Sequence, residues 1–430
     1  MRITVPEIDC SEGFTNKNDL FERKKLSKRL ENIIENSDDE NLVIAINDIW
    51  GNGKTTFLKM WEAELKGNDK FQVVYFDAFK NDFQTDPFIA IASHIYSIIE
   101  DNSKKQKYLE ATKRAANVLF KASIKFGISA LTLGAVKGTD VENLGDSLKD
   151  AVSEPIDNYL ENKITQLENE NNSIEHFKHV LSETGKEKKV IFIIDELDRA
   201  RPNYSLELLE KIKHVFNTTN IYFILSFDKE QFKHVIRKNY GDIDADIYLN
   251  KFVHLWFSLP REESTYTQRP TMKKYLEYIN RTILERDDRL KTSIVILTTL
   301  LRINNFSLRD AERCFSLLLV ATAQEENSYR WEYQVGFAIV AFLKLKNESI
   351  IKKIYTKTIS KDEVLKELGI NETITKSTAH IIMAINTELL SDEDYSKALE
   401  ENKNTVFGAD YGDRPQTLTF AIERIYDITL

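Results

Sequence analysis

The chain has 430 residues and a net charge of −9, and 42% of its residues are hydrophobic and 30% charged. This composition predicts a globular, soluble protein of two or three domains, and it argues against a surface dominated by non-specific binding to nucleic acid, although a local basic groove is compatible with it. Because the only cysteines, Cys10 and Cys314, lie far apart and no apolar signal-peptide core follows Met1, we expect a cytoplasmic protein without disulfides.

The first 260 residues alternate between segments with helical periodicity and short apolar segments rich in β-branched residues. The expected helices are residues 19–35, 57–66, 87–99, 205–216 and 227–240. The expected strands are residues 42–46, 71–76, 190–194, 221–225 and 252–259. Since strands that are apolar throughout are typical of parallel sheets with both faces covered, the pattern predicts an α/β core. A charged, mostly helical stretch interrupts the alternation at residues 108–187, and nearly everything after residue 271 has a helical period.

The most informative segment is a glycine-rich loop between the first predicted strand and the next helix. Gly51 and Gly53 would let backbone N–H groups point inward at phosphate oxygens, and the helix that begins at Lys54 adds the positive end of its dipole. Lys54 would supply a cation for the terminal phosphates, and Thr55 a hydroxyl for Mg²⁺. The alternative is a turn that only joins strand to helix. The residues expected to bind nucleotide here are Trp50, Gly51, Asn52, Gly53, Lys54, Thr55 and Thr56.

One position of this loop departs from the phosphate-binding pattern G-x-x-x-x-G-K-[ST], because its first glycine falls at Asp48. A carboxylate roughly 6 Å from a phosphate would cost about 2–3 kcal/mol at an effective dielectric constant near 20. The cost disappears if Asp48 points away and bonds to its own turn, and aspartate also tolerates positive φ. The substitution therefore weakens the prediction of tight nucleotide binding more than the prediction of the fold.

A second part of the expected site follows the apolar strand at residues 190–194, which ends in Asp195 and Glu196. Ligands of open α/β sheets bind at the carboxyl ends of the strands, where Asp195 would emerge. There Asp195 could hold Mg²⁺ through water, and Glu196 could orient or deprotonate the attacking water. The alternative is an acidic strand end that caps the next helix. With the glycine loop upstream, we favour the metal-binding and catalytic roles.

Further candidates surround these two motifs. Arg199 and Arg201 could stabilise transition-state charge, in cis or across a subunit boundary, or could pair with neighbouring carboxylates as scaffolding. Ser226, at the end of the fourth predicted strand, stands where a polar residue could sense a γ-phosphate, whereas Asp228 could cap the following helix. Arg309 opens a later helix and could reach back to phosphate or remain solvated.

Several stretches, taken in order, resemble the KAP family of P-loop NTPases, which includes bacterial phage-exclusion ATPases. The similar stretches are residues 18–34, Trp50 to Thr56, Tyr75 to Phe79, Asp195 to Arg199 with Arg201 and Pro202, residues 225–228 and residues 248–260. They lie within residues 15–325, and the last hundred residues match nothing that can be named. The resemblance implies a core related to AAA-type ATPases, ATP or GTP with Mg²⁺, homo-oligomers or a partner effector protein, and a role in antiviral defence.

We therefore predict a parallel-sheet P-loop NTPase core of the ASCE or AAA-like type with a helical insertion, a helical lid and a helical C-terminal domain. The first half of the core is expected in residues 1–100 and the second in residues 189–262. The insertion is expected in residues 101–188, the lid in residues 263–330 and the C-terminal domain in residues 331–430.

Many KAP members carry transmembrane segments in the insertion, but the apolar run at residues 126–136 is too short to cross roughly 30 Å of hydrocarbon as a helix. Extending it backwards admits Lys125 and Lys121, each of which opposes insertion by roughly 2.5–3.5 kcal/mol near mid-membrane. Arg114, Asn117, Lys121 and Lys125 share one helical face, so residues 114–136 could lie on a membrane or dock a partner. We favour a helix packed at the edge of the core.

The leading hypothesis is a Mg²⁺-dependent nucleoside triphosphatase that acts as a switch or motor. The second is a scaffold that binds nucleotide, or nothing, without hydrolysing it, which the aspartate at position 48 suggests. The third is an ATPase stimulated by nucleic acid, which the arginines suggest and the acidic composition opposes.

Overall fold

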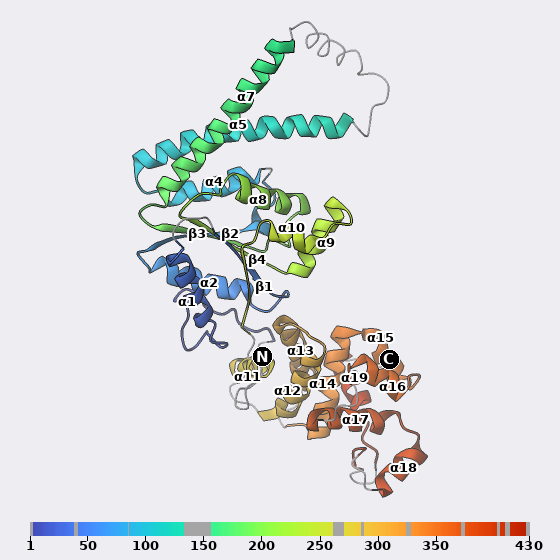
Figure 1. Ribbon diagram of the computed structural model, residues 1–430. Helices are drawn as coiled ribbons and strands as arrows, with labels where there is room; N and C mark the ends of the chain where they lie inside the picture. The colour runs from blue at the N-terminus through green and yellow to red at the C-terminus, as the bar shows by residue number, and fades with distance from the viewer. Residues whose placement is uncertain are drawn as a thin grey trace.

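The computed structural model describes residues 3–37, 42–84, 86–132, 156–260, 271–284, 288–323, 328–370, 375–401, 405–408 and 413–426. Its centre is a five-stranded parallel sheet (Figure 1). The strands are β1 (Val43–Asn47), β2 (Phe71–Asp77), β3 (Lys189–Asp195), β4 (Ile221–Phe227) and β5 (Leu255–Ser258). These apolar runs with many β-branched residues become strands that are buried over most of their length.

The strands lie in the order β2-β3-β4-β1-β5. One strand, β4, therefore separates β1, which leads into the glycine loop, from β3, which ends in the acidic pair. This order confirms the predicted P-loop NTPase core of the ASCE type. Since all five strands are parallel, their carboxyl ends meet at one edge, where the glycine loop, the acidic pair and the turn after β4 come together.

Helices cover both faces of the sheet, as the apolar strands predicted (Figure 1). On one face, α1 (Lys24–Glu35) and α2 (Lys54–Lys66) pack against Ile44, Ile46 and Ile191. The other face is covered chiefly by α4 (Pro87–Ile98), α8 (Pro202–His214) and α9 (Lys229–Tyr240), with the shorter helices α3 (Ala78–Asn81) and α10 (Ala245–Asn250). Alternate residues of each strand serve the two cores, so the register of the sheet is well determined.

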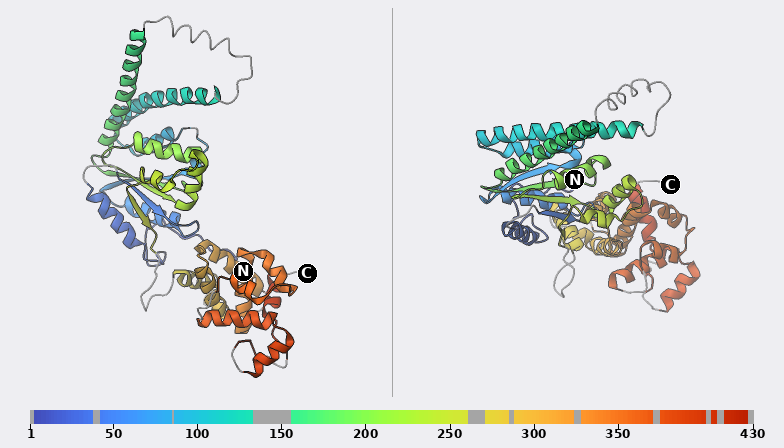
Figure 2. Two further views of the ribbon diagram at one scale, coloured as in Figure 1. Left: turned by 45° about the vertical axis from the view of Figure 1, so that its right-hand side comes forward. Right: turned by 45° about the horizontal axis from the view of Figure 1, so that its top comes forward.

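A long helical hairpin is inserted between β2 and β3. Its helices α5 (Asn102–Thr132) and α7 (Ile156–Thr184) contact each other near the core and then diverge as they project from it, as Figures 1 and 2 show. Tyr108 and Phe177 anchor the base of the hairpin beside Phe88. Within the described residues, no helix combines the length and the apolarity that a membrane span requires. The end of the candidate 114–136 segment, and the side chains of Lys121 and Lys125, lie outside the described part.

Most of the helices formed by the residues after β5 share one hydrophobic core. The helices after β5 are α11 (Thr271–Leu284), the 3-10 turn η1 (Asp288–Leu290), α12 (Lys291–Ile303), α13 (Leu308–Thr322), α14 (Trp331–Lys346), α15 (Glu348–Tyr355), α16 (Lys361–Glu367), α17 (Lys376–Leu389), α18 (Asp392–Glu400) and α19 (Thr417–Tyr426). The body lies on the side of the sheet opposite the hairpin (Figure 2). Helices α14 and α19 approach closely at Gly336, where a Cβ would lie 2.3 Å from the Thr417 carbonyl oxygen.

Several predicted boundaries were wrong, and three of them have a clear local reason. The first helix starts at Lys24, not at residue 19, because the Asp19 carboxylate accepts the N–H groups of Arg23 and Lys24. Helix α8 starts at Pro202, a residue suited to the first helical turn. Strand β5 starts at Leu255 rather than at residue 252, since the two residues after Lys251 still donate their N–H groups to the Leu249 carbonyl at the end of α10.

Candidate nucleotide-binding site

The glycine loop runs from the end of β1 to the first residue of α2, as predicted. Gly51 and Gly53 have φ angles of 87° and 82°, in the left-handed region that favours glycine. A Cβ at Gly51 would lie 2.6 Å from the Cβ of Arg309 and 2.7 Å from the hydroxyl of Ser307. The loop is therefore enclosed so closely by the start of α13 that neither its conformation nor its surroundings admit a side chain at Gly51.

The Asp48 carboxylate bonds to its own turn, which is the arrangement expected to remove its electrostatic cost for phosphate binding. Its carboxylate is almost fully buried, and Oδ1 accepts the backbone N–H of Ile49 at 2.8 Å and the side-chain amide of Asn52 at 2.7 Å. Asp48 does not use the positive φ that aspartate tolerates. The Asn52 amide oxygen in turn accepts the N–H of Leu308 at 3.2 Å, so a polar chain joins the loop to α13.

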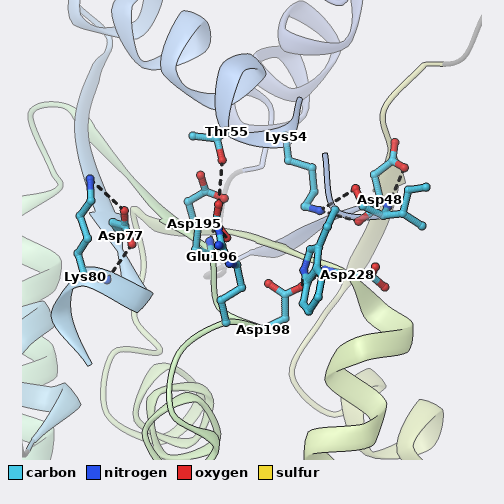
Figure 3. Close-up of polar contacts among 12 residues, drawn as sticks. Asp48, Lys54, Thr55, Asp77, Lys80, Asp195, Glu196, Asp198 and Asp228 are labelled. Atoms are coloured by element: carbon cyan, nitrogen blue, oxygen red, sulfur yellow. Dashed lines mark hydrogen bonds and ion pairs between the residues drawn. The ribbon is translucent and has the colours of Figure 1, made fainter. Parts of the chain in front are cut away.

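Lys54 and Thr55 occupy the start of α2, and Figure 3 shows their side chains directed toward the carboxyl ends of the strands. The Lys54 ammonium donates to the carbonyl oxygens of Asp48 at 2.6 Å and Ile49 at 3.3 Å, which holds it across the loop. The Thr55 hydroxyl donates to Glu196 Oε1 at 3.5 Å. The two motifs, which are more than a hundred residues apart in the sequence, thus meet through these two side chains.

Asp195 and Glu196 differ in their surroundings. Asp195 is 1% exposed, and its carboxylate accepts the Tyr75 hydroxyl at 2.7 Å and the backbone N–H of Glu196 at 2.9 Å. Burial and the adjacent Asp195 charge raise the pKa of Tyr75, which keeps that hydroxyl a donor. Glu196 is partly exposed and has a φ of 56°, a conformation that is uncommon for residues other than glycine. The first carboxylate is fixed, and the second faces the open side of the site.

Trp50 contributes a polar contact that its sequence position did not reveal. Its indole N–H donates to Asp198 Oδ2 at 2.6 Å, while its ring remains 44% exposed beside the loop. Burial raises the pKa of the Asp198 carboxyl, and the hydrogen bonds that it accepts act in the opposite direction. Trp50 therefore links the glycine loop to the turn after β3.

A cavity of about 540 Å³ opens beside the loop, a size in the range of roughly 300–1,000 Å³ that small-molecule sites occupy. Lys54, Thr55 and Glu196 line one side. The start of α13 contributes Leu308 and Arg309. Apolar residues of the N-terminal segment complete the wall: Val5, Pro6, Ile8, Phe14, Leu20 and Phe21. This wall could not be predicted from the sequence, because these residues follow no helical or strand period.

Arg23 is a second residue that sequence reasoning missed. It is 7% exposed, and its guanidinium donates to the carbonyl oxygens of Asn52 at 3.0 Å and Gly53 at 3.4 Å. The same group lies 4.7 Å from the centre of the Phe21 ring. Arg23 immediately precedes α1, and the sequence alone does not distinguish it from the other charged residues on the surface of that helix. In the fold it braces the glycine loop and adds positive charge beside it.

The remaining candidates lie at different distances from the cavity. Arg309 lines it, and its backbone N–H donates to the Gly51 carbonyl at 3.2 Å. Arg199 also lines it and forms an ion pair with Glu196, whereas Arg201 donates its backbone N–H to Asp82 and its guanidinium to the Gln84 carbonyl.

Two polar residues follow or end β4. Asp228 caps α9 by accepting the N–H groups of Glu230 and Gln231, as was predicted for this residue. Ser226 is fully buried, and its hydroxyl has no hydrogen-bond partner in the described part of the chain.

Thr56 lines the cavity from the first turn of α2.

The donor set suits a triphosphate with Mg²⁺. Enclosed glycines, a lysine and a helix start face the cavity, and the Thr55 hydroxyl lies 3.5 Å from the Glu196 carboxylate. Among the residues that the structure describes, no group of three His, Cys, Asp or Glu side chains could hold a metal ion by itself. Mg²⁺ in nucleotide sites usually keeps several waters and is bound by one or two carboxylates together with substrate phosphates.

The family model of the KAP family P-loop domain matches residues 23–325. The chain belongs to the KAP family. The matched range takes in the glycine loop, the acidic pair and the lid residue Arg309, and it agrees with the range of the resemblance in the sequence. The last hundred residues, which fold as part of the C-terminal helical body, lie outside the match.

Among curated proteins, this KAP chain is 30% identical over 76 residues to the phage T7 exclusion protein of Escherichia coli strain K12. The match covers 18% of this chain and 10% of that protein, so it spans only a small part of either.

Among solved structures, the chain is similar to the Cdc6p protein of Pyrobaculum aerophilum at 12% identity and a TM-score of 0.39, with 98% of each chain covered. It is also similar to the ORC2 protein of Aeropyrum pernix at 13% identity and a TM-score of 0.35, with 98% of this chain and 88% of that one covered.

Proposed function

We propose that this protein hydrolyses a nucleoside triphosphate, ATP or GTP, in a Mg²⁺-dependent reaction. The observation that carries the proposal is the meeting of the two motifs, in which Thr55 lies 3.5 Å from Glu196 and Lys54 stands beside them at the start of α2. Phosphoryl transfer needs little covalent chemistry from the protein and depends on positioning and charge stabilisation. A lysine, a hydroxyl residue and a carboxylate are suited to both tasks.

Each residue has a distinct task in this proposal. The loop N–H groups bind the β- and γ-phosphates, and Lys54 exchanges its carbonyl partners for phosphate oxygens. Thr55 and Asp195 would hold Mg²⁺, and Arg309 would reach the phosphates from the start of α13. Glu196 orients the attacking water or takes its proton. The metal, when bound, neutralises charge on the phosphate oxygens.

The finer proposal is that hydrolysis drives a switch or motor in defence against phage. The match to the phage T7 exclusion protein and membership of the KAP family support it. A plaque assay with cells that express the wild-type protein or Lys54→Ala tests this part. Protection that needs Lys54 is expected, and equal plaque numbers with and without the wild-type protein would remove the defence role while leaving the hydrolase proposal intact.

Phosphate release by the purified protein tests the hydrolase proposal. We expect Lys54→Ala to lose both binding and turnover, and Glu196→Gln to bind Mg²⁺ and nucleotide while losing turnover about 10²-fold or more. Lys66→Ala is a matched control, because Lys66 lies at the exposed far end of the same helix and pairs with Glu62. Turnover that persists in both Lys54→Ala and Glu196→Gln would refute the proposal.

A scaffold that binds nucleotide without hydrolysis is the second candidate, because Asp48 replaces the first glycine of the phosphate-binding pattern. If Mg²⁺ and ATP bind the wild-type protein with no phosphate release at any protein concentration, the scaffold replaces the hydrolase. Calorimetry and phosphate release on the same preparation separate the two.

A further inference from the structure

Arg199 makes the closest contact to the carboxylate that the proposed function assigns as the base. Its guanidinium lies 2.8 Å from Glu196 Oε2, and the two residues of this ion pair are three positions apart in the sequence. The other oxygen, Oε1, accepts the Thr55 hydroxyl at 3.5 Å. Both oxygens of Glu196 are therefore engaged, one by a charge and one by the residue expected to bind the metal. Figure 3 shows the contact between Thr55 and Glu196.

The surroundings of Arg199 hold it in this position. The guanidinium lies 5.3 Å from the centre of the Phe79 ring, which belongs to α3 at the end of β2 and is itself 49% exposed. The backbone of Glu196, with φ of 56°, presents its side chain at the turn that also carries Arg199. Conformations of this kind persist where the surrounding structure fixes them, and they cluster at functional sites.

This arrangement has a chemical consequence. A carboxylate acts as a base through a lone pair and its negative charge, and a guanidinium bound to it occupies one lone pair and offsets part of that charge, which weakens the carboxylate as a base. We propose that Arg199 is a positioning residue that holds Glu196 off the attacking water until the ion pair opens. The inference rests on the proposed function, since it assigns regulation to the same site.

The exposure of the pair makes it a contact that opens easily. The side chains of Arg199 and Glu196 are 40% and 22% exposed. Ion pairs of this kind are weak and are screened by salt. Any contact that draws the guanidinium away, such as a phosphate or a protein surface over Phe79, would release the Glu196 carboxylate without rearranging the buried Asp195.

Turnover of Arg199→Ala at saturating nucleotide and Mg²⁺ tests the proposal. We expect kcat to rise about two- to fivefold, which corresponds to about 0.4–1 kcal/mol, the range of exposed ion pairs, with KM unchanged. Arg199→Lys, which keeps the charge, should stay near the wild-type rate. Arg201→Ala is a matched control, because Arg201 is similarly exposed but binds Asp82 and Gln84 instead. Phe79→Ala should raise kcat in the same direction by a smaller factor.

A second measurement uses the protein without nucleotide. In NMR spectra of the arginine side chains, the guanidinium signal that disappears in Arg199→Ala should be protected from solvent exchange in the wild type and lose that protection in Glu196→Gln. Equal exchange in the two proteins would overturn the proposal. So would a kcat of Arg199→Ala at or below the wild-type value, since Arg199 would then support catalysis.

These outcomes keep the two proposals apart. If the wild type hydrolyses nucleotide and needs Lys54, the proposed function stands whichever way Arg199→Ala changes the rate, and only the role of Arg199 is decided. If neither the wild type nor Arg199→Ala hydrolyses nucleotide, both proposals fail together.

Discussion

Trp50 and Asp198 are joined by a hydrogen bond of 2.6 Å from the indole N–H to Oδ2. The same oxygen accepts the backbone N–H of Asp228 at 2.7 Å. A single carboxylate oxygen thus connects the glycine loop, the turn after β3 and the start of α9, three segments that are far apart in the sequence. Because all three meet at the carboxyl edge of the sheet, Asp198 fixes the geometry of the site without lining the cavity.

We expect Asp198→Ala to destabilise the core, because it leaves the Trp50 and Asp228 donors without their shared acceptor. The cost of such a loss is about 1–3 kcal/mol. At ~2–4 °C per kcal/mol for a domain of this size, Tm should fall by several degrees. Asp198→Asn can present its amide oxygen to both donors and should lie within about 1 kcal/mol of the wild type. Equal Tm values for the alanine variant and the wild type in thermal unfolding would contradict the role of Asp198.

Stability should also depend on pH through Asp198. Burial raises its pKa in the folded protein above the unfolded value of about 3.9, so its contribution to stability is fully present below that value and is lost as pH rises through the folded pKa. Compared with Asp198→Asn, the wild type should therefore lose stability as pH rises from about 4. Above the folded pKa of Asp198, the difference in stability between the two proteins should stay constant. Thermal unfolding of the two proteins across the acid range checks this. A wild type that gains on the variant as pH rises would show that the pKa is lowered instead.

Gly51→Ala should disturb both the loop and the lid. The left-handed backbone costs about 1–3 kcal/mol for a residue with a side chain, and the new Cβ would meet the start of α13. We expect nucleotide binding, measured by calorimetry, to weaken roughly tenfold or more while the circular dichroism spectrum is retained. Gly408→Ala is the control, since a Cβ at Gly408 meets nothing within 4 Å. Unchanged affinity in the Gly51 variant would show that nucleotide does not bind at the glycine loop.

Asp48→Gly restores the usual phosphate-binding pattern but removes the acceptor of two hydrogen bonds within the loop. At about 0.5–1.5 kcal/mol for each bond, we expect nucleotide affinity to fall roughly two- to tenfold or more. Asp48→Asn keeps an acceptor oxygen and should bind within about twofold of the wild type, on the same scale of energies. Calorimetry with Mg²⁺ and ATP measures both. Tighter binding by Asp48→Gly would mean that the carboxylate opposes phosphate, which favours the scaffold hypothesis.

The sequence predicted the fold and the two motifs because their signals are local. An apolar run of β-branched residues before glycines, lysine and threonine specifies a strand, a loop and a helix within twenty residues. The buried strand before Asp195 is an equally local pattern. Boundaries failed where a single side chain or turn decided them, as when Asp19 capped α1 and the end of α10 took up the residues expected to open β5.

The contacts that support the site could not be predicted in the same way. The bonds from Arg23 to the loop carbonyls, from Trp50 to Asp198 and from Asn52 to the start of α13 each join segments distant in sequence. Such pairs have no periodicity, and their residue types are common on solvated surfaces. Asn52 is expected to bind nucleotide through the loop, and what the sequence did not indicate is that its side chain lies between Asp48 and the start of α13.

The most direct test of the central claim is a crystal structure of the protein with Mg²⁺ and a non-hydrolysable triphosphate analogue. We expect the β- and γ-phosphates among the N–H groups of residues 51–55, with Lys54 moved from the loop carbonyls to phosphate and the metal against Thr55. A loop that stays closed at saturating analogue, with Lys54 still bound to the Asp48 carbonyl and no phosphate density beside Thr55, would contradict the account.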